Sequence, residues 1–135
     1  MTNSKSKGKR GELELAEFLR ECGYEARRGQ QFAGGQDSPD IIHNVSGIHF
    51  EAKRCEQSSP SLIYSWIKQA QTDAPPDRQP VIAFRSNRQC WLAIMTLDEF
   101  LYMVEMLDSA NKLIDEVRAE CAKASAMVET MVQLP

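Results

Sequence analysis

Hydrophobic and polar positions along the chain predict a small α/β domain followed by one long helix. Apolar residues recur three and four positions apart from about residue 8 to 22 and again from 61 to 72, which is the helical period. Five other short runs are rich in β-branched and aromatic residues and are typical of strands. These predicted strands cover residues 24–28, 40–45, 48–53, 80–85 and 90–95. The expected order is therefore helix, three strands, helix, two strands and a final helix.

The first predicted helix places one acidic residue among its apolar side chains. On a helical wheel its apolar side contains Leu15, Ala16, Leu19 and Cys22, and its opposite side contains Glu14, Glu17 and Glu21. Glu12 falls on the apolar side, where a carboxylate is costly unless it is hydrogen-bonded or lies near a cation. Alternatively, Glu12 lies in an exposed first turn, where the helix dipole favours an acid. The helix is expected to end at Gly23, a residue type suited to the C′ position.

Residues 40–53 are predicted to form a β-hairpin that turns near residues 46–47. Alternation along its second strand places Ile48, Phe50 and Ala52 on a core face, and His49, Glu51 and Lys53 on a face that carries chemistry. The hairpin would bring Asp40 close to Glu51, and two adjacent carboxylates repel unless a proton or cation lies between them. Such hard oxygen ligands favour Mg²⁺ or Mn²⁺, and Lys53 could hold a water or a phosphate oxygen beside the metal. We therefore expect a metal site of the phosphodiester-cleaving kind.

The final helix is expected to begin at a capping box, residues 96–99, and no Gly or Pro interrupts residues 100–131. Its apolar positions follow a heptad-like stripe that Glu120 breaks: Met103, Met106, Ala110, Leu113, Val117, Ala124, Met127 and Met131. We expect a core of residues 1–97 and a helix of residues 98–135 within a single domain. This helix would pack either on its own core or against the same helix of a second copy.

Composition fits one soluble domain, with 42% hydrophobic and 26% charged residues. No run of about 18 apolar residues suggests a membrane span, and no signal peptide is visible. We expect a cytoplasmic protein that does not bind membranes. The four cysteines form no C-x-x-C pair, so neither a zinc site nor a disulfide framework is expected.

The net charge of −3 is unevenly distributed. Residues 1–90 carry 13 Lys or Arg and 11 Asp or Glu, whereas residues 91–135 carry 3 and 8. Basic residues cluster before the first helix and before the glycine-rich loop 29–39, and contact with phosphates depends on such local patches. The basic N-terminal cluster is also compatible with a solvated tail, and the loop with a disordered connection. His43 and His49 are interpreted as structural residues.

Several of these segments together resemble the PD-(D/E)XK nucleases. The signature is Pro39-Asp40 followed by Glu51-Ala52-Lys53. The accompanying motifs are Lys7-Gly8, Gly11-Glu12, Gly23-Tyr24, Arg27-Arg28-Gly29-Gln30-Gln31-Phe32 and Trp91-Leu92-Ala93-Ile94-Met95. Over about residues 7–104 the chain is similar to archaeal-type (Hjc-like) Holliday-junction resolvases and to PD-(D/E)XK endonucleases carried by bacteriophages and prophages.

This resemblance implies a restriction-endonuclease-like α/β core, with a mixed five-stranded sheet flanked by helices. It also implies that Asp40, Glu51 and the carbonyl of Ala52 ligate Mg²⁺, for which Mn²⁺ can substitute. Lys53 would orient or activate the attacking water, and Glu12 would approach the same ion. The residues expected to contact DNA are Lys7, Lys9, Arg10, Arg27, Arg28, Gln30, Gln31, Ser38, Arg54 and Gln69.

We therefore predict a Mg²⁺-dependent, structure-selective DNA endonuclease that acts in a bacterial or phage-infected cell. It would resolve four-way junctions by paired nicks, as a homodimer. One alternative is a phage DNase or nickase that acts on other branched or replicating DNA. Another is a non-catalytic DNA-binding adaptor that docks through its long C-terminal helix.

Overall fold

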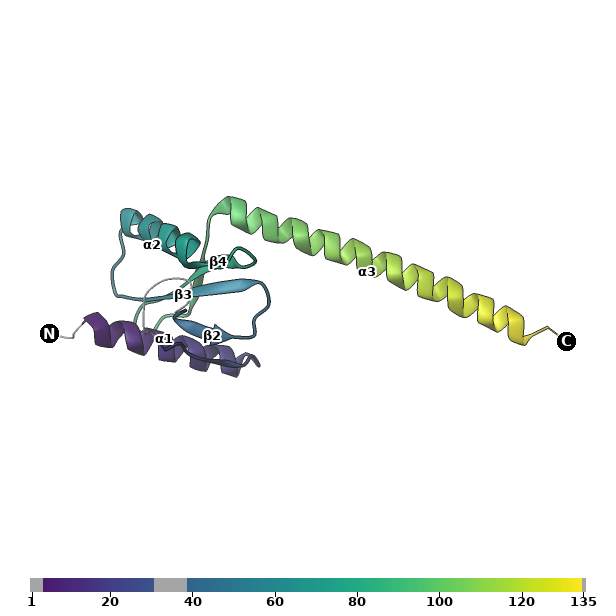
Figure 1. Cartoon of the computed structure of the whole chain (residues 1–135), viewed down its shortest axis with the longest axis horizontal. Helices are drawn as coiled ribbons and strands as arrows, with labels where there is room; N and C mark the ends of the chain where they lie inside the picture. Colours follow the sequence, from purple (N-terminus) through teal and green to yellow (C-terminus); the bar gives the residue numbers. More distant parts are fainter. Residues whose placement is uncertain (1–3, 31–38, 135) are drawn as a thin grey trace. The chain divides into compact units, whose positions relative to one another are not determined.

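The computed structural model describes residues 4–30 and 39–134, which fall into two compact units, Met1–Thr96 and Leu97–Pro135. Each unit is described by itself. The first contains α1 (Ser4–Glu21), β1 (Ala26–Arg28), β2 (Ile41–His43), β3 (Ile48–Arg54), α2 (Pro60–Asp73), β4 (Gln79–Arg85) and β5 (Leu92–Ile94), and the second contains α3 (Leu97–Val132) (Figure 1). The predicted order of helices and strands is therefore confirmed.

Helix α1 begins earlier than predicted and ends where expected. Because it starts at Ser4, the basic residues Lys7, Lys9 and Arg10 lie within the helix and not before it. At its other end, Gly23 has a φ of 92°, and its N–H donates to the carbonyl of Arg20 at 3.0 Å. The N–H of Tyr24 donates to the carbonyl of Leu19 at 3.0 Å. These two hydrogen bonds form a Schellman motif, which confirms Gly23 as the C′ residue.

The strands form two sheets, so the prediction of one five-stranded sheet is wrong. Strands β1 and β2 pair antiparallel, while β3, β4 and β5 form a mixed sheet in which β3 is parallel to β4. The predicted hairpin of residues 40–53 is also wrong, because β2 pairs with β1 and β3 pairs with β4. A helical crossover through α2 makes the parallel pairing possible, since parallel neighbours cannot be joined by a tight turn.

Helices α1 and α2 cover opposite faces of the mixed sheet (Figure 1). On one side, Leu15, Ala16 and Leu19 of α1 pack with Ala83 of β4; on the other, Trp66 and Ala70 of α2 pack with Ile82. Phe50 and Ala52, on the predicted core face of β3, pack against the α1 cluster, while His49 and Glu51 on the other face are buried as well. A sheet covered on both sides buries both sets of side chains.

Helix α3 forms the second unit, and none of its residues is buried. Besides the stripe that Glu120 interrupts, its sequence contains a second stripe at alternating spacings of three and four residues. This second stripe has no charged member: Phe100, Met103, Leu107, Ala110, Ile114, Val117, Cys121, Ala124, Val128 and Met131. Among the described residues, no helix combines the length and apolar character that a membrane span requires.

Candidate active site

Two acidic residues meet where β2 approaches the middle of β3. Asp40 directly precedes β2, and its Oδ2 accepts a hydrogen bond from the N–H of Ala52 at 3.3 Å. Burial raises the pKa of Glu51, the residue before Ala52, and the nearby charge of Asp40 raises it further. Asp40 thus lies close to Glu51 as expected, but it is held there by its hydrogen bond to Ala52 and not by a β2–β3 hairpin.

The carboxylate of Glu51 is buried but well supplied with hydrogen bonds. It is 5% exposed, and its Oε1 accepts from Nζ of Lys53 at 2.8 Å and from Nε2 of Gln69 at 2.9 Å. Nζ of Lys53 also donates to Oε1 of Gln69 at 3.0 Å, so the three side chains form a closed triangle. Because both of these bonds reach Oε1, the remaining oxygen of Glu51 is the one suited to a further ligand.

Glu12 is a third carboxylate in the same electrostatic cluster. It is 7% exposed and accepts a hydrogen bond from Nε of Arg28 on β1. Burial raises the pKa of Glu12, the hydrogen bond from Arg28 lowers it, and the charge of Asp40 raises it. The alternative of an exposed first turn is wrong, because α1 begins at Ser4 and buries Glu12 among neighbouring elements.

Gly29 fixes the position of Asp40, a role that the sequence did not reveal. The N–H of Gly29 donates to the carbonyl of Asp40 at 2.8 Å. A Cβ on Gly29 would lie 1.8 Å from the carbonyl oxygen of Pro39, so the two backbones can approach only at a glycine. In the sequence, a glycine at the start of a loop does not distinguish a flexible position from such a close approach.

The donor set around Asp40 and Glu51 fits a small divalent cation. Among residues 4–30 and 39–134, no three His, Cys, Asp or Glu side chains are gathered as metal ligands. Glu12 is instead engaged by Arg28. The candidate donors are then the carboxylates of Asp40 and Glu51 and the carbonyl of Ala52, all hard oxygens of the kind that Mg²⁺ and Mn²⁺ prefer. A cation there would also offset the repulsion that raises the pKa of Glu51.

The residues predicted to contact DNA lie in different surroundings. Five are exposed on α1, on β1 or just after it: Lys7, Lys9, Arg10, Arg27 and Gln30. Arg28 binds Glu12 and Gln69 binds Glu51, so both residues lie beside the acidic cluster. Gln31 and Ser38 lie outside the described residues.

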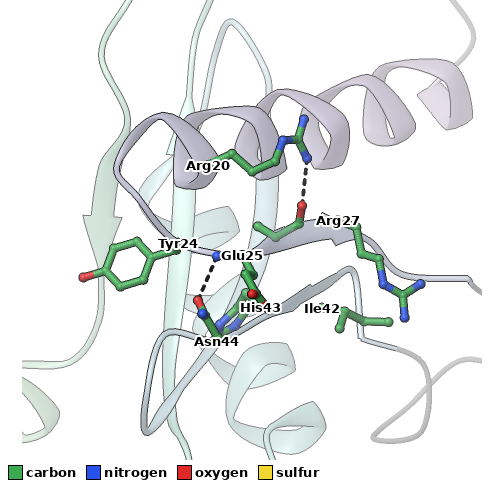
Figure 2. A pocket seen from close by; sticks show the side chains of 8 residues that line it. Arg20, Tyr24, Glu25, Arg27, Ile42, His43 and Asn44 are labelled. Carbon is green, nitrogen blue, oxygen red and sulfur yellow. Dashed lines mark hydrogen bonds between the residues drawn. The ribbon is translucent and has the colours of Figure 1, made fainter.

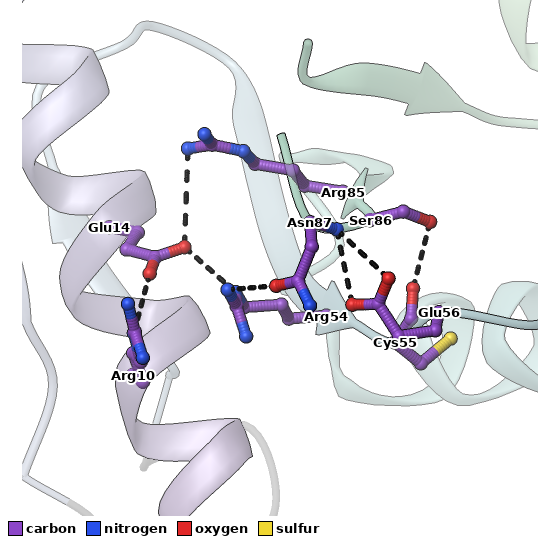
Figure 3. Close-up of polar contacts among 8 residues, drawn as sticks. All are labelled: Arg10, Glu14, Arg54, Cys55, Glu56, Arg85, Ser86 and Asn87. Atoms are coloured by element: carbon purple, nitrogen blue, oxygen red, sulfur yellow. Dashed lines mark hydrogen bonds and ion pairs between the residues drawn. The ribbon is translucent and has the colours of Figure 1, made fainter. Parts of the chain in front are cut away.

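Arg10 and Arg54 converge on Glu14, which the helical wheel placed on the solvent side. That placement is wrong, because the side chain of Glu14 is only 21% exposed and accepts from Nε of Arg10 at 2.8 Å and from Nε of Arg54 at 2.9 Å. The wheel shows the angular position of a residue but not which neighbouring strand approaches it. Figure 3 shows the two guanidinium groups directed at the same carboxylate.

A cavity of about 500 Å³ lies at the other end of β1 and β2, lined in part by Arg20, Arg27 and Asn44 (Figure 2). Its polar groups hold the fold together. Nη1 of Arg20 donates to the carbonyl of Ala26 at 2.7 Å, and Oδ1 of Asn44 accepts from the N–H of Glu25 at 2.9 Å. We therefore assign this cavity no chemical role.

The two histidines lie in structural surroundings. Nδ1 of His43 accepts from the N–H of Val45 at 3.2 Å, and its ring lies 5.0 Å from that of Phe50. His49 is 5% exposed, and burial lowers the pKa of both rings. Burial therefore favours the neutral form of both rings.

Comparison with known protein families gives one match. The family described as "Phage putative PDDEXK endonuclease" matches residues 3–134. No curated protein and no solved structure matches the chain. The family match extends through α3, whereas the motifs visible in the sequence end near residue 104.

Proposed function

Since the chain belongs to the phage putative PDDEXK endonuclease family, we propose that it is a metal-dependent DNA endonuclease whose cleavage site is formed by Asp40, Glu51 and Lys53. The observation that carries this proposal is the triangle of Lys53, Glu51 and Gln69 beside a second carboxylate. A buried Glu51 with a raised pKa and a nearby like charge is costly to the fold. Such an arrangement is typical of a site that serves chemistry and not stability.

In this proposal, Asp40, Glu51 and the Ala52 carbonyl hold one divalent ion, with Mg²⁺ or Mn²⁺ as the candidates. A divalent ion bound there supplies Lewis-acid stabilisation of the scissile phosphate and lowers the pKa of a coordinated water. Asp40 and Glu51 provide the negative charge that retains the ion, and Glu12 adds to the negative potential. Arg28 holds Glu12 through its hydrogen bond.

Lys53 supplies the positive charge of the site. Its ammonium group is positioned by hydrogen bonds to both Glu51 and Gln69, at 2.8 and 3.0 Å. A positive charge held in this way stabilises the negative charge that develops on the phosphate during cleavage. Gln69 acts as a positioning residue, because it fixes Lys53 and Glu51 relative to each other.

We propose a four-way DNA junction as the substrate and paired nicks as the reaction. The motifs shared with junction resolvases support this choice of substrate. Two symmetric cuts require two copies of the site, and the uncharged stripe of α3 is suited to pairing with a second copy. Cleavage of other branched or replicating DNA by a nickase is the alternative.

The test is a cleavage assay with four-way junction, fork, nicked and linear DNA, with and without Mg²⁺. We expect the junction to be cut fastest, and Asp40→Ala and Glu51→Ala to lose at least 100-fold in rate while retaining junction binding in EDTA. His43→Ala serves as a control outside the proposed site. Wild-type rates for both carboxylate variants would refute the assignment, and equal cutting of all four DNAs would refute junction selectivity.

A further inference from the structure

A second polar pocket beside α1 is not used by the proposed cleavage chemistry. It has a volume of about 680 Å³ and is lined by Arg10, Glu14, Arg54, Arg85, Asn87 and Arg88. We call it the arginine pocket, and Figure 3 shows all of these residues except Arg88. Four of its six lining residues are arginines. The question is why so many guanidinium groups converge at one place.

The fold brings these residues together from α1, β3, β4 and the turn that follows β4. Arg54 and Arg85 are partners in the parallel register of β3 and β4, at the carboxyl ends of both strands. Ligands of α/β proteins commonly bind outside the carboxyl ends of parallel strands. Gly11 lets α1 approach this edge, since a Cβ at Gly11 would lie 2.9 Å from Cβ of Arg54. This contact places Glu14 within hydrogen-bonding distance of Arg54.

The positive charge of the pocket is only partly neutralised. Glu14 binds Arg10 through Oε1 and Arg54 through Oε2. Nη1 of Arg85 lies 4.0 Å from Oε2. Glu56, at the edge of the pocket, accepts from the N–H of Asn87. Even with both acids included, the four arginines leave an excess of positive charge. The side chain of Arg54 is 12% exposed, so part of this charge is removed from water.

A phosphate group matches this arrangement in charge and geometry. Guanidinium groups present several N–H donors in a plane and bind phosphate oxygens bidentately. Arg54 directly follows Lys53 at the carboxyl end of β3, so the two sites lie at the same end of the sheet. Their side chains leave opposite faces, since Lys53 bonds to Gln69 of α2 and Arg54 bonds to Glu14 of α1. A DNA strand that contacts both sites would therefore cross this end of the sheet.

We propose that the arginine pocket binds a backbone phosphate of the DNA near the cleavage site, and that Glu14 is an internal competitor which this phosphate displaces. The proposal rests on the proposed function, since it takes DNA as the ligand. Before binding, Glu14 keeps Arg10 and Arg54 arranged around one anion position. On binding, the phosphate takes over these hydrogen bonds and Glu14 turns to solvent.

The competing explanation is that Glu14 and Arg54 only fasten α1 to the sheet. Under that explanation, Glu14→Gln lowers stability. Its DNA affinity changes only as much as the loss of one negative charge elsewhere on α1 would change it. Under our proposal, the same substitution increases DNA affinity beyond that level. The two explanations therefore predict different results for one variant.

The experiment measures binding of a fluorescent four-way junction in EDTA, where metal-dependent cleavage cannot occur. Glu14→Gln is compared with Glu17→Gln, which makes the same charge change at an exposed position of α1. We expect Glu14→Gln to bind roughly 3- to 10-fold more tightly than Glu17→Gln, because one competing carboxylate is removed. Equal affinities for the two variants would overturn the role of Glu14.

A second pair of variants tests the pocket without changing Glu14. Arg85→Ala with Arg88→Ala removes two pocket charges, and Lys68→Ala with Arg78→Ala removes two exposed charges elsewhere. We expect the pocket variant to bind at least 5-fold more weakly than its control. The negative slope of log K against log salt concentration should also become shallower by about 0.9 for one lost phosphate contact. Equal affinity and slope would overturn the pocket as a phosphate site.

The two proposals can fail independently. If the wild-type protein cuts DNA but the pocket variants bind like their controls, the arginine pocket is refuted and the endonuclease stands. If no divalent metal supports cleavage but the pocket variants show the expected changes in binding, the endonuclease is refuted and the pocket stands. Thermal melts of each variant establish that the compared proteins are folded.

Discussion

At the scale of single residues, the candidate site depends on carboxylates that the fold buries at a cost. Glu12 and Glu51 are both less than a tenth exposed, and burial raises the pKa of each. Hydrogen bonds from Arg28 and Lys53 offset part of this cost, while the charge of Asp40 adds to it. These two buried acids are therefore expected to lower the stability of the metal-free protein.

Replacing Glu51 with Gln tests this cost directly. The pKa of Glu51 is higher in the folded chain than in the unfolded chain, so between the two values the folded state holds more protons. Stability therefore falls as the pH rises through this window, and the ionised carboxylate remains unfavourable above it. We expect Glu51→Gln to raise the free energy of unfolding by about 1 kcal/mol at pH 7.5. Below pH 4 the difference should disappear.

Urea denaturation of both proteins at pH 7.5 and pH 3.5, without metal, gives the measurement. A Glu51→Gln protein that is less stable than wild type at pH 7.5 would show that the bonds to Lys53 and Gln69 outweigh the burial of charge. Adding Mg²⁺ provides a second comparison. It should raise the midpoint of the wild-type protein and have less effect on the variant, because one metal donor is weakened.

Gly29 lies where the backbone leaves no room for a side chain. A methyl group at Gly29 would collide with the carbonyl of Pro39, so the backbone holding Asp40 must move. We expect Gly29→Ala to destabilise the fold by about 2 kcal/mol or more and to reduce cleavage at least 10-fold. Gly8→Ala is the matched control, because no atom lies within 4 Å of a Cβ there. It should be neutral or stabilise α1 by up to about 1 kcal/mol.

Thermal melts and the junction assay measure both effects of these glycine variants. If Gly29→Ala were as stable and active as Gly8→Ala, the close contact between the two backbones would not exist in solution.

At the scale of helices and strands, the sequence predicted each element to within a few residues, because periodicity and turn residues act locally. Pairing of the strands was predicted less well. Residues 46–47 resemble a hairpin turn, and Gly47 has a φ of 70° as such a turn requires. Yet β2 pairs with β1 over three residues and β3 pairs with β4 over seven, so residues 46–47 connect two sheets and not two paired strands. Local turn chemistry therefore did not determine the partner of β3.

The same limit applies to the two sides of α1. The wheel correctly predicted Leu15, Ala16 and Leu19 as buried, and it located Glu12 among them. It failed for Glu14 because the partner, Arg54, is 40 residues away. A charged residue at the border of an apolar face can be exposed or partly buried, and the strand that packs beside it determines which.

At the scale of the whole molecule, the proposed paired nicks require two copies of the chain. The uncharged stripe of α3 contains ten apolar positions at heptad spacing, and charged residues such as Asp115 and Glu116 lie off it. Two such helices could bury this stripe against each other.

We therefore predict that the protein is a dimer and that Val117→Glu converts it to a monomer, because a carboxylate would be buried at the centre of the stripe. Ala119→Glu adds the same charge off the stripe and should leave the dimer intact. Light scattering at several protein concentrations measures the mass of each protein. A monomeric wild-type protein would contradict the dimer, and equal masses for the two variants would exclude this stripe as the interface.

By itself the sequence determined the order of the helices and strands, the end of α1 at Gly23, and the identity of the acids and the lysine that form the candidate site. These features follow from spacing, turn chemistry and residue type, which act over a few positions. Only the tertiary structure decided that the strands form two sheets, that Gly29 positions Asp40, that Gln69 and Arg28 support the acids, and that Arg10, Arg54 and Arg85 converge on Glu14. These features depend on which distant segments pack together, and the total burial and hydrogen bonding of the folded chain sets that choice.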